Sequence, residues 1–138
     1  MINKQVRDAL RSVLIGIEVD GAPLFDEDSV YAHRQTIGSA ESETLPAACI
    51  YVESGEVETK HSIEEDDVDF VVEVYDKAVL SIDDRLDELM GIIRPVIKAN
   101  RTLNGLVDYI KLTAYKYESD DSNTIGVLTL NLVATIEQ

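Results

Sequence analysis

The apolar residues at the start of the chain recur with the spacing of an amphipathic helix. Residues three or four positions apart share one face of a helix, so this spacing predicts a helix of about four turns that packs by one face. We expect the helix to stop near Gly16, and Asp20-Gly21 indicates a turn after it. The predicted buried face consists of Ile2, Val6, Leu10, Val13, Leu14 and Ile17.

A second helical pattern begins at Ser81. The stretch 81–84 is close to a capping box, and its two acids favour the positive end of the helix dipole. Pro95 lacks a backbone donor and clashes with the preceding turn, which predicts a kink or break between Gly91 and Arg94. A turn is expected at Asn104-Gly105. The predicted buried stripe consists of Ile82, Leu86, Leu89, Met90, Ile93 and Ile97.

Strand character appears in four further stretches, at residues 47–52, 70–75, 109–117 and 125–136. The last two form a hairpin across the polar turn at 118–123. In the final strand, the predicted core face carries Leu128, Leu130, Leu132, Ala134 and Ile136. In the strand before it, we expect Ile110, Leu112 and Ala114 on the core face, and Tyr109, Lys111, Thr113, Tyr115 and Tyr117 on the other.

The order of these elements predicts an α+β fold. We expect a mostly antiparallel (mixed) sheet of about four main strands, with two helices packed on one face, in a single domain over residues 1–138. Short strands are expected at 23–25 and 30–31, and a loop at 36–44. The other face of the sheet carries Tyr and Thr, so it must meet solvent, a neighbouring subunit or both.

Acidic residues crowd together between positions 53 and 69, where the only basic residue is Lys60. So dense a cluster of charge excludes the span from the core, and we expect either a mobile loop or the tip of an extended hairpin. The acids are Glu53, Glu56, Glu58, Glu64, Glu65, Asp66, Asp67 and Asp69.

The charge balance narrows the function classes. Twelve basic residues stand against 27 acidic ones, a net charge of −15, and the basic residues are scattered singly along the chain. Without a Lys/Arg cluster, tight binding to nucleic acid or to an anionic membrane is disfavoured. The acidity is interpreted either as a means of solubility or as a surface to which DNA does not adhere. No stretch approaches the length of a membrane span, and the N-terminus predicts a helix start, not a signal peptide.

The residues with chemical potential form no catalytic constellation. Cys49 is the only cysteine and lies in an apolar run, which favours a small core residue over a nucleophile and suits a reducing cytoplasm. His33 and His61 are expected at the surface. The acids at 64–67 lack the spacing of a calcium loop, which favours a solvated acidic segment over a metal site. We therefore predict no catalytic, cofactor or metal residue, and no enzyme.

Several segments follow one another in an order and spacing known from one protein family. The aromatic residues Tyr115 and Tyr117 precede the acidic turn at Asp120-Asp121, and a Leu-Thr-Leu strand follows at 128–130. The earlier segments are 45–52, 69–75, 84–90 and 93–96. In these features the chain resembles the tail terminator family of siphophages, often called minor tail protein U. Residues 22–44 depart most and have the character of a variable insertion.

The resemblance implies a structural virion protein at the head-proximal end of a phage tail, assembled in the host cytoplasm. Tail terminators form a homo-oligomeric, hexameric ring that caps the tail tube, ends its polymerisation and presents a surface to the head–tail connector. DNA passes through the ring without tight binding. Partners would be the tail tube protein, the connector and further copies of the chain.

Candidate interface residues with the tube or a neighbouring subunit are taken from the acidic span and the last hairpin: Glu53, Glu56, Glu58, Glu64, Glu65, Asp66, Asp67, Tyr115, Tyr117, Asp120 and Asp121. Three other interpretations stay open. They are a head–tail neck or tail-completion protein, a non-viral acidic adaptor domain, and a divalent-metal-dependent enzyme that uses the carboxylates.

Overall fold

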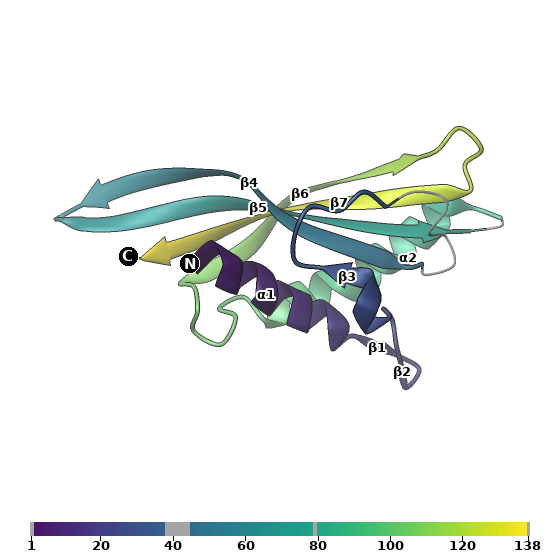
Figure 1. Ribbon diagram of the computed structural model, residues 1–138, viewed down its shortest axis with the longest axis horizontal. Coiled ribbons are helices and arrows are strands. Elements are labelled where there is room, and N and C mark those ends of the chain that lie inside the picture. The colour runs from purple at the N-terminus through teal and green to yellow at the C-terminus, as the bar shows by residue number, and fades with distance from the viewer. Residues whose placement is uncertain (1, 38–44, 79, 138) are drawn as a thin grey trace.

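The computed structural model describes residues 2–37, 45–78 and 80–137. Two helices lie on one face of a five-stranded sheet with the order β3-β4-β5-β7-β6 (Figure 1). The short β3 runs parallel to β4, and all other neighbours are antiparallel. The elements are α1 (Ile2–Ile15), β3 (Val30–Tyr31), β4 (Ala47–Lys60), β5 (Ile63–Lys77), α2 (Ile82–Ala99), β6 (Tyr109–Ser119) and β7 (Ile125–Glu137). The predicted α+β fold is confirmed.

A small hairpin and a short helix connect α1 to the sheet. Strand β1 (Glu18–Val19) pairs with β2 (Ala22–Pro23) across the predicted turn, where both turn residues have positive φ. The 3-10 helix η1 (Glu27–Ser29) then leads into β3, one of the two expected short strands. Most of the loop expected at 36–44 falls outside the described residues. No helix in the described ranges is long and apolar enough to cross a membrane.

The core is the layer between the helices and the sheet. All six residues of the predicted α2 stripe are buried, and α1 buries Val6, Leu10 and Leu14. They pack on the alternate residues of the long strands, among them Phe70, Val72 and Leu130. Burying one such large apolar side chain contributes about 1.5–3 kcal/mol, so this layer supplies most of the driving force for folding.

Helix α2 runs without interruption through Pro95, so the expected break between Gly91 and Arg94 is wrong. Proline at this position removes one backbone hydrogen bond and costs roughly 3 kcal/mol. The buried residues Met90, Ile93 and Ile97 lie on both sides of it and offset this cost. The start of the helix is as predicted, because the Ser81 side chain accepts a hydrogen bond from the Asp84 N–H at 3.2 Å.

A β-bulge in β6 reverses the faces of two tyrosines. The register shifts between Leu112 and Ala114, after which Tyr115 lies opposite Leu130 and Tyr117 opposite Leu128. Both tyrosines therefore lie on the helix side of the sheet, and the prediction that placed them on the opposite face is wrong. The cause is the extra residue of the bulge, which shifts a strand's alternation by one position.

The acidic span folds as the outer half of the β4–β5 hairpin, so the mobile-loop alternative is wrong and the hairpin alternative is confirmed (Figure 1). A two-residue turn at His61 and Ser62 closes it, and both residues have the positive φ that twisted hairpins favour. We expected the whole span to be excluded from the core, but Val68 points to the helix side and is buried. We call residues 53–69 the acidic arm.

We predict that Gly126→Ala destabilises the fold. A Cβ on Gly126 would lie 2.5 Å from Ile82 Cγ1 and 3.1 Å from the Glu118 carbonyl oxygen, at the junction of β7 and α2. Overpacking of this kind costs about 1–3 kcal/mol, so the free energy of unfolding in urea should fall by that amount.

Gly91→Ala is the matched control, because a Cβ at this exposed position of α2 meets no atom within 4 Å. Replacing a helical glycine with alanine should raise the free energy of unfolding by about 0.5–1 kcal/mol. Equal stability of the two variants would contradict the close packing of Ile82 against β7.

Candidate functional site

The face of the sheet opposite the helices, which we call the open face, contains a trough of about 700 Å³ across its four long strands. Strand alternation places most of these residues here, since their neighbours along each strand point to the helices. Thr113 and Ala114 are consecutive and both line the trough, because the β6 bulge interrupts the alternation there. The trough is rich in carboxylates, and Lys116 is the only cation among the described residues that line it. It is lined by Tyr51, Glu53, Asp69, Val71, Glu73, Tyr75, Thr113, Ala114, Lys116, Glu118, Val127, Thr129 and Asn131.

Glu73 is the centre of a small polar cluster at one side of this trough. The Cys49 Sγ donates a hydrogen bond to Glu73 Oε1 at 3.3 Å, and the Tyr75 hydroxyl donates to the same oxygen at 3.5 Å. Nearby, the Arg34 guanidinium lies 4.1 Å from the centre of the Tyr51 ring and donates to the Val52 carbonyl at 3.0 Å. Residues 34–36 line a small hollow together with Tyr51 and Glu73, beside β4 on the open face.

The two hydrogen-bond donors of this cluster, Cys49 and Tyr75, hold their protons at neutral pH. Burial raises the pKa of the Cys49 thiol to about 12, and the hydrogen bond to Glu73 and its charge add to the effect. Burial and the same carboxylate raise the pKa of Tyr75 to about 12. Cys49 is fully buried, as predicted, but it lies opposite Glu73 on the open face and not in the layer beneath the helices. As a buried thiol with a raised pKa, it is unsuited to nucleophilic chemistry.

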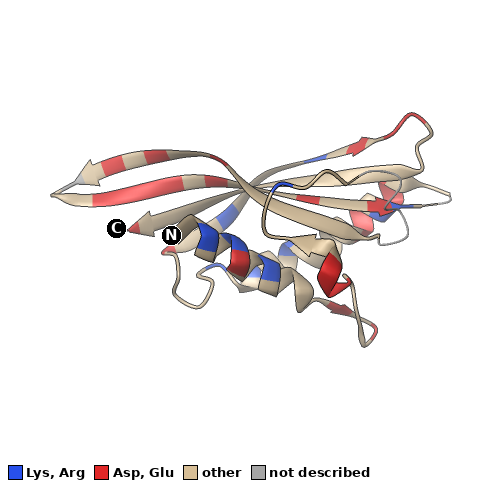
Figure 2. Ribbon diagram, viewed as in Figure 1, with Lys and Arg blue, Asp and Glu red and all other residues tan. Residues whose placement is uncertain are grey.

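The acidic arm extends beyond the helices, and acidic segments follow both of its strands (Figure 2). Like charges face each other across the strands, as Glu56 does Asp67 and Glu65 does Glu137. Such pairs destabilise a sheet by about 0.2–1 kcal/mol each. Asp67 is held by the Thr135 hydroxyl at 2.9 Å. The arm also exposes two apolar side chains, Val57 at 67% and Ile63 at 48%.

The remaining predicted interface residues lie at the opposite end of the sheet (Figure 1). The Tyr117 hydroxyl donates to Asp87 Oδ1 of α2 at 2.6 Å, while Tyr115 is half exposed. Asp120 closes the β6–β7 turn by accepting hydrogen bonds from the Thr124 and Ile125 N–H groups. Desolvation raises the pKa of Asp120, but these backbone donors outweigh it and the pKa is lowered. The predicted interface residues therefore form two separate groups, one at each end of the sheet.

Sequence reasoning missed a basic groove. Although the basic residues are isolated along the chain, four of them meet between α2 and the free edge of β6, around a hollow of about 290 Å³: Arg94, Lys98, Arg101 and Lys111. The sequence could have predicted this groove. Arg94 and Lys98 are four residues apart on one helix, and Asp108 is the only acid between positions 89 and 117.

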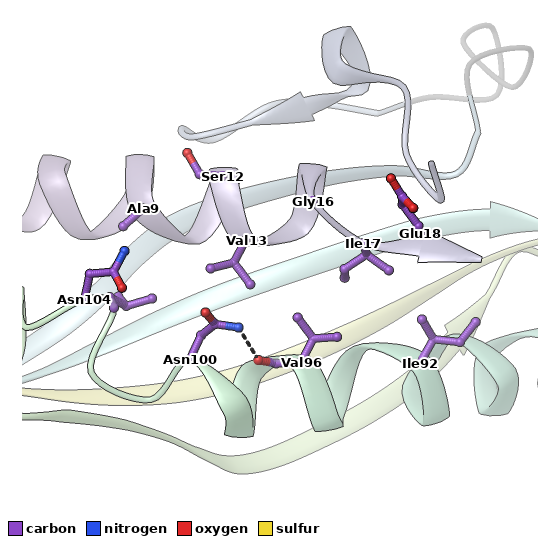
Figure 3. A pocket seen from close by; sticks show the side chains of 11 residues that line it. Ala9, Ser12, Val13, Gly16, Ile17, Glu18, Ile92, Val96, Asn100 and Asn104 are labelled. Atoms are coloured by element: carbon purple, nitrogen blue, oxygen red, sulfur yellow. Dashed lines mark hydrogen bonds between the residues drawn. The ribbon is translucent and has the colours of Figure 1, made fainter. Parts of the chain in front are cut away.

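A second groove, of about 700 Å³, runs between α1 and α2 (Figure 3). Small apolar side chains line it, including Ala9, Val13 and Val96. The Asn100 amide donates to the Val96 carbonyl at 2.8 Å and is thereby engaged within α2 and its cap. No group of His, Cys, Asp and Glu side chains in the described residues is arranged to hold a metal ion. His33 and His61 are exposed, as predicted.

The sequence profile of the family described as phage minor tail protein U matches residues 1–135. A solved structure described as "Virion of native gene transfer agent (GTA) particle" contains a similar chain, with 14% sequence identity and a TM-score of 0.45. The similarity covers 99% of this chain and 92% of that chain. Likeness at this level carries no functional argument, so the family match is the basis for function. No curated protein sequence matches the chain.

We predict that Cys49 in the folded chain reacts with iodoacetamide at about pH 8.5 at least about a hundredfold more slowly than in the unfolded chain. Only the thiolate reacts. A pKa of about 12 leaves very little thiolate at this pH, whereas an unfolded cysteine, with a pKa of about 8.5, is half ionised. Mass spectrometry over time measures the rate. Glu73→Gln should speed the reaction of the folded protein, and equal rates for folded and unfolded wild type would contradict the cluster.

Proposed function

Because the chain belongs to the phage minor tail protein U family, with a structural role in the phage tail, we propose that it caps the tail tube as a homo-oligomeric, hexameric ring. The ring ends tube polymerisation at the head-proximal end of the tail and offers the surface to which the head–tail connector binds. The observation that carries this proposal is the family match over residues 1–135, nearly the whole chain.

The arrangement of surfaces supports a ring. Closed rings are built from head-to-tail contacts, in which one surface of a subunit meets a different surface of the next. The chain offers unlike surfaces of this kind: the acidic arm, the open face with its trough, and the basic groove at the far edge of the sheet. The protein acts by geometry in this proposal, and no residue is assigned to bond chemistry.

The net charge of −15 suits a passage for DNA. Negative side chains repel the phosphate backbone, so a ring of such subunits would let the duplex pass without holding it. A head–tail neck or tail-completion protein would share this property and is the second candidate for the same chain. The two roles differ in what happens to tube length when the protein is absent.

Electron microscopy of particles from a lysate lacking this gene tests the proposal. Overlong tubes without heads are expected, because nothing would stop the addition of tube subunits. Tails of normal length, detached from filled heads, would overturn the terminator role in favour of neck joining. Intact infectious virions would contradict both.

We predict that replacing Glu64, Glu65, Asp66 and Asp67 with Ser impairs tail capping without unfolding the subunit. The substitutions remove like-charge pairs from the arm, so the free energy of unfolding should stay the same or rise by about 0.2–1 kcal/mol per pair. Capping is measured by the lengths of tails made when the variant complements the deletion. A control on another surface replaces two acids, Glu18 and Asp28, which are exposed and distant in the chain, with Ser. Normal tails with the arm variant would exclude the arm from capping.

A further inference from the structure

The basic groove is an unusual surface in so acidic a chain. Arg94, Lys98, Arg101 and Lys111 are all exposed, and none of the four forms an ion pair with another described residue. Between the charges lies an apolar floor to which Ile97 and Leu112 contribute. A surface that combines cations with an apolar floor fits a segment that combines carboxylates with an exposed apolar side chain.

The groove is built by the fold and is not a chance meeting of flexible side chains. Arg94 and Lys98 lie one turn apart in α2, and Arg101 follows the end of the helix. The Ile110 N–H donates to the Arg101 carbonyl at 2.6 Å, which ties the end of the helix to β6 and positions Lys111 beside it. Cations near a helix C-terminus also interact favourably with the helix dipole. Lys111 is on a strand and has no such role.

The acidic arm has the complementary chemistry. Val57 is exposed on β4 and lies directly opposite Asp66 of the paired strand. Strand alternation puts Glu64 on this same face of the arm and Glu56 on the other face, so each face of the arm carries carboxylates. The arm cannot fill its own groove, because β4 and β6 belong to opposite sides of the sheet, separated by β5 and β7. A second copy can bring the two together.

Both sheet edges are open for such an approach. Strand β3 pairs only with Ala48 and Cys49, so within the described residues the outer half of β4 has a strand neighbour on one side only. Among the strands that the structure describes, β7 is the only neighbour of β6.

We propose that the acidic arm of one copy docks in the basic groove of the next, and that this contact repeats around the ring. The inference rests on the proposed ring and names the surfaces that close it. It also accounts for the like charges within the arm, because cations of the neighbouring subunit compensate a repulsion that the isolated subunit must bear.

Charge reversal tests the contact. One variant reverses the groove (Arg94→Glu with Lys98→Glu), a second reverses the arm (Glu56→Lys with Glu64→Lys), and a third carries all four changes. Placing like charges together in an interface weakens it by on the order of 100-fold, so each reversal should lower the titre of the complemented deletion phage by about that factor and give overlong tails. The combined variant should recover at least about tenfold, since opposite charges meet again.

A matched control reverses two exposed cations outside the groove, Lys4→Glu with Lys77→Glu, and changes the net charge by the same amount as the groove variant. It should keep normal titre and tail length. Circular dichroism melting reports whether each variant folds, and recovery in the combined variant cannot arise from misfolding. If both reversals cap tails as wild type does, or the combined variant shows no recovery, the docking is overturned.

Carbodiimide cross-linking of wild-type tails gives a second readout, because it joins a carboxylate directly to a lysine amine. Links from Lys98 or Lys111 to Glu56 or Glu64 are expected, and mixed isotope labelling shows whether they join two copies. Absence of these links, or links within one copy only, would overturn the contact.

The outcomes also separate this inference from the proposed function. Overlong tubes on gene deletion with inert charge reversals would leave the ring standing and remove the docking, whereas normal tubes on deletion would remove the ring itself. If the groove reversal abolishes duplex binding by the purified protein and leaves capping unchanged, the groove binds DNA phosphates and not the acidic arm. That result would overturn the docking.

Discussion

The structure depends on the burial of one face of a long sheet beneath two helices. Four long strands expose two faces, and α1 and α2 together cover only one of them, over part of its length. The side chains between the layers are almost all apolar and fully buried, so the hydrophobic effect is concentrated there. Everything outside this layer, including the open face, the acidic arm and both sheet edges, is left available for contacts with other molecules.

Two β-bulges adapt the sheet to this one-sided burial. The bulge after Val52 marks the point where β4 leaves the core and becomes part of the acidic arm. The bulge after Leu112 turns Tyr117 toward α2, where its hydroxyl reaches Asp87. One additional residue in each strand thus decides which side chains serve the core and which serve the surface.

Folding also segregates charge that is mixed along the chain. Carboxylates gather on the arm and in the trough, where Glu73 is held by Cys49 and Tyr75, while four cations gather between α2 and β6. The separation gives one subunit two surfaces of opposite charge, at opposite edges of its sheet. That polarity is a property on which directional, head-to-tail assembly can be based.

The sequence by itself determined the helices, the main strands and the residues of the core, because the hydrophobic period is local and the buried stripe of α2 can be read without knowing its partner. It also indicated the family, through the order of its segments. Only the tertiary structure decided the continuity of α2 through Pro95, the faces of Tyr115 and Tyr117, and the basic groove. The continuity depends on packing that outweighs a local penalty, and the tyrosine faces on a bulge that alternation cannot reveal. The groove depends on a contact between residues far apart in the chain, which no local pattern encodes.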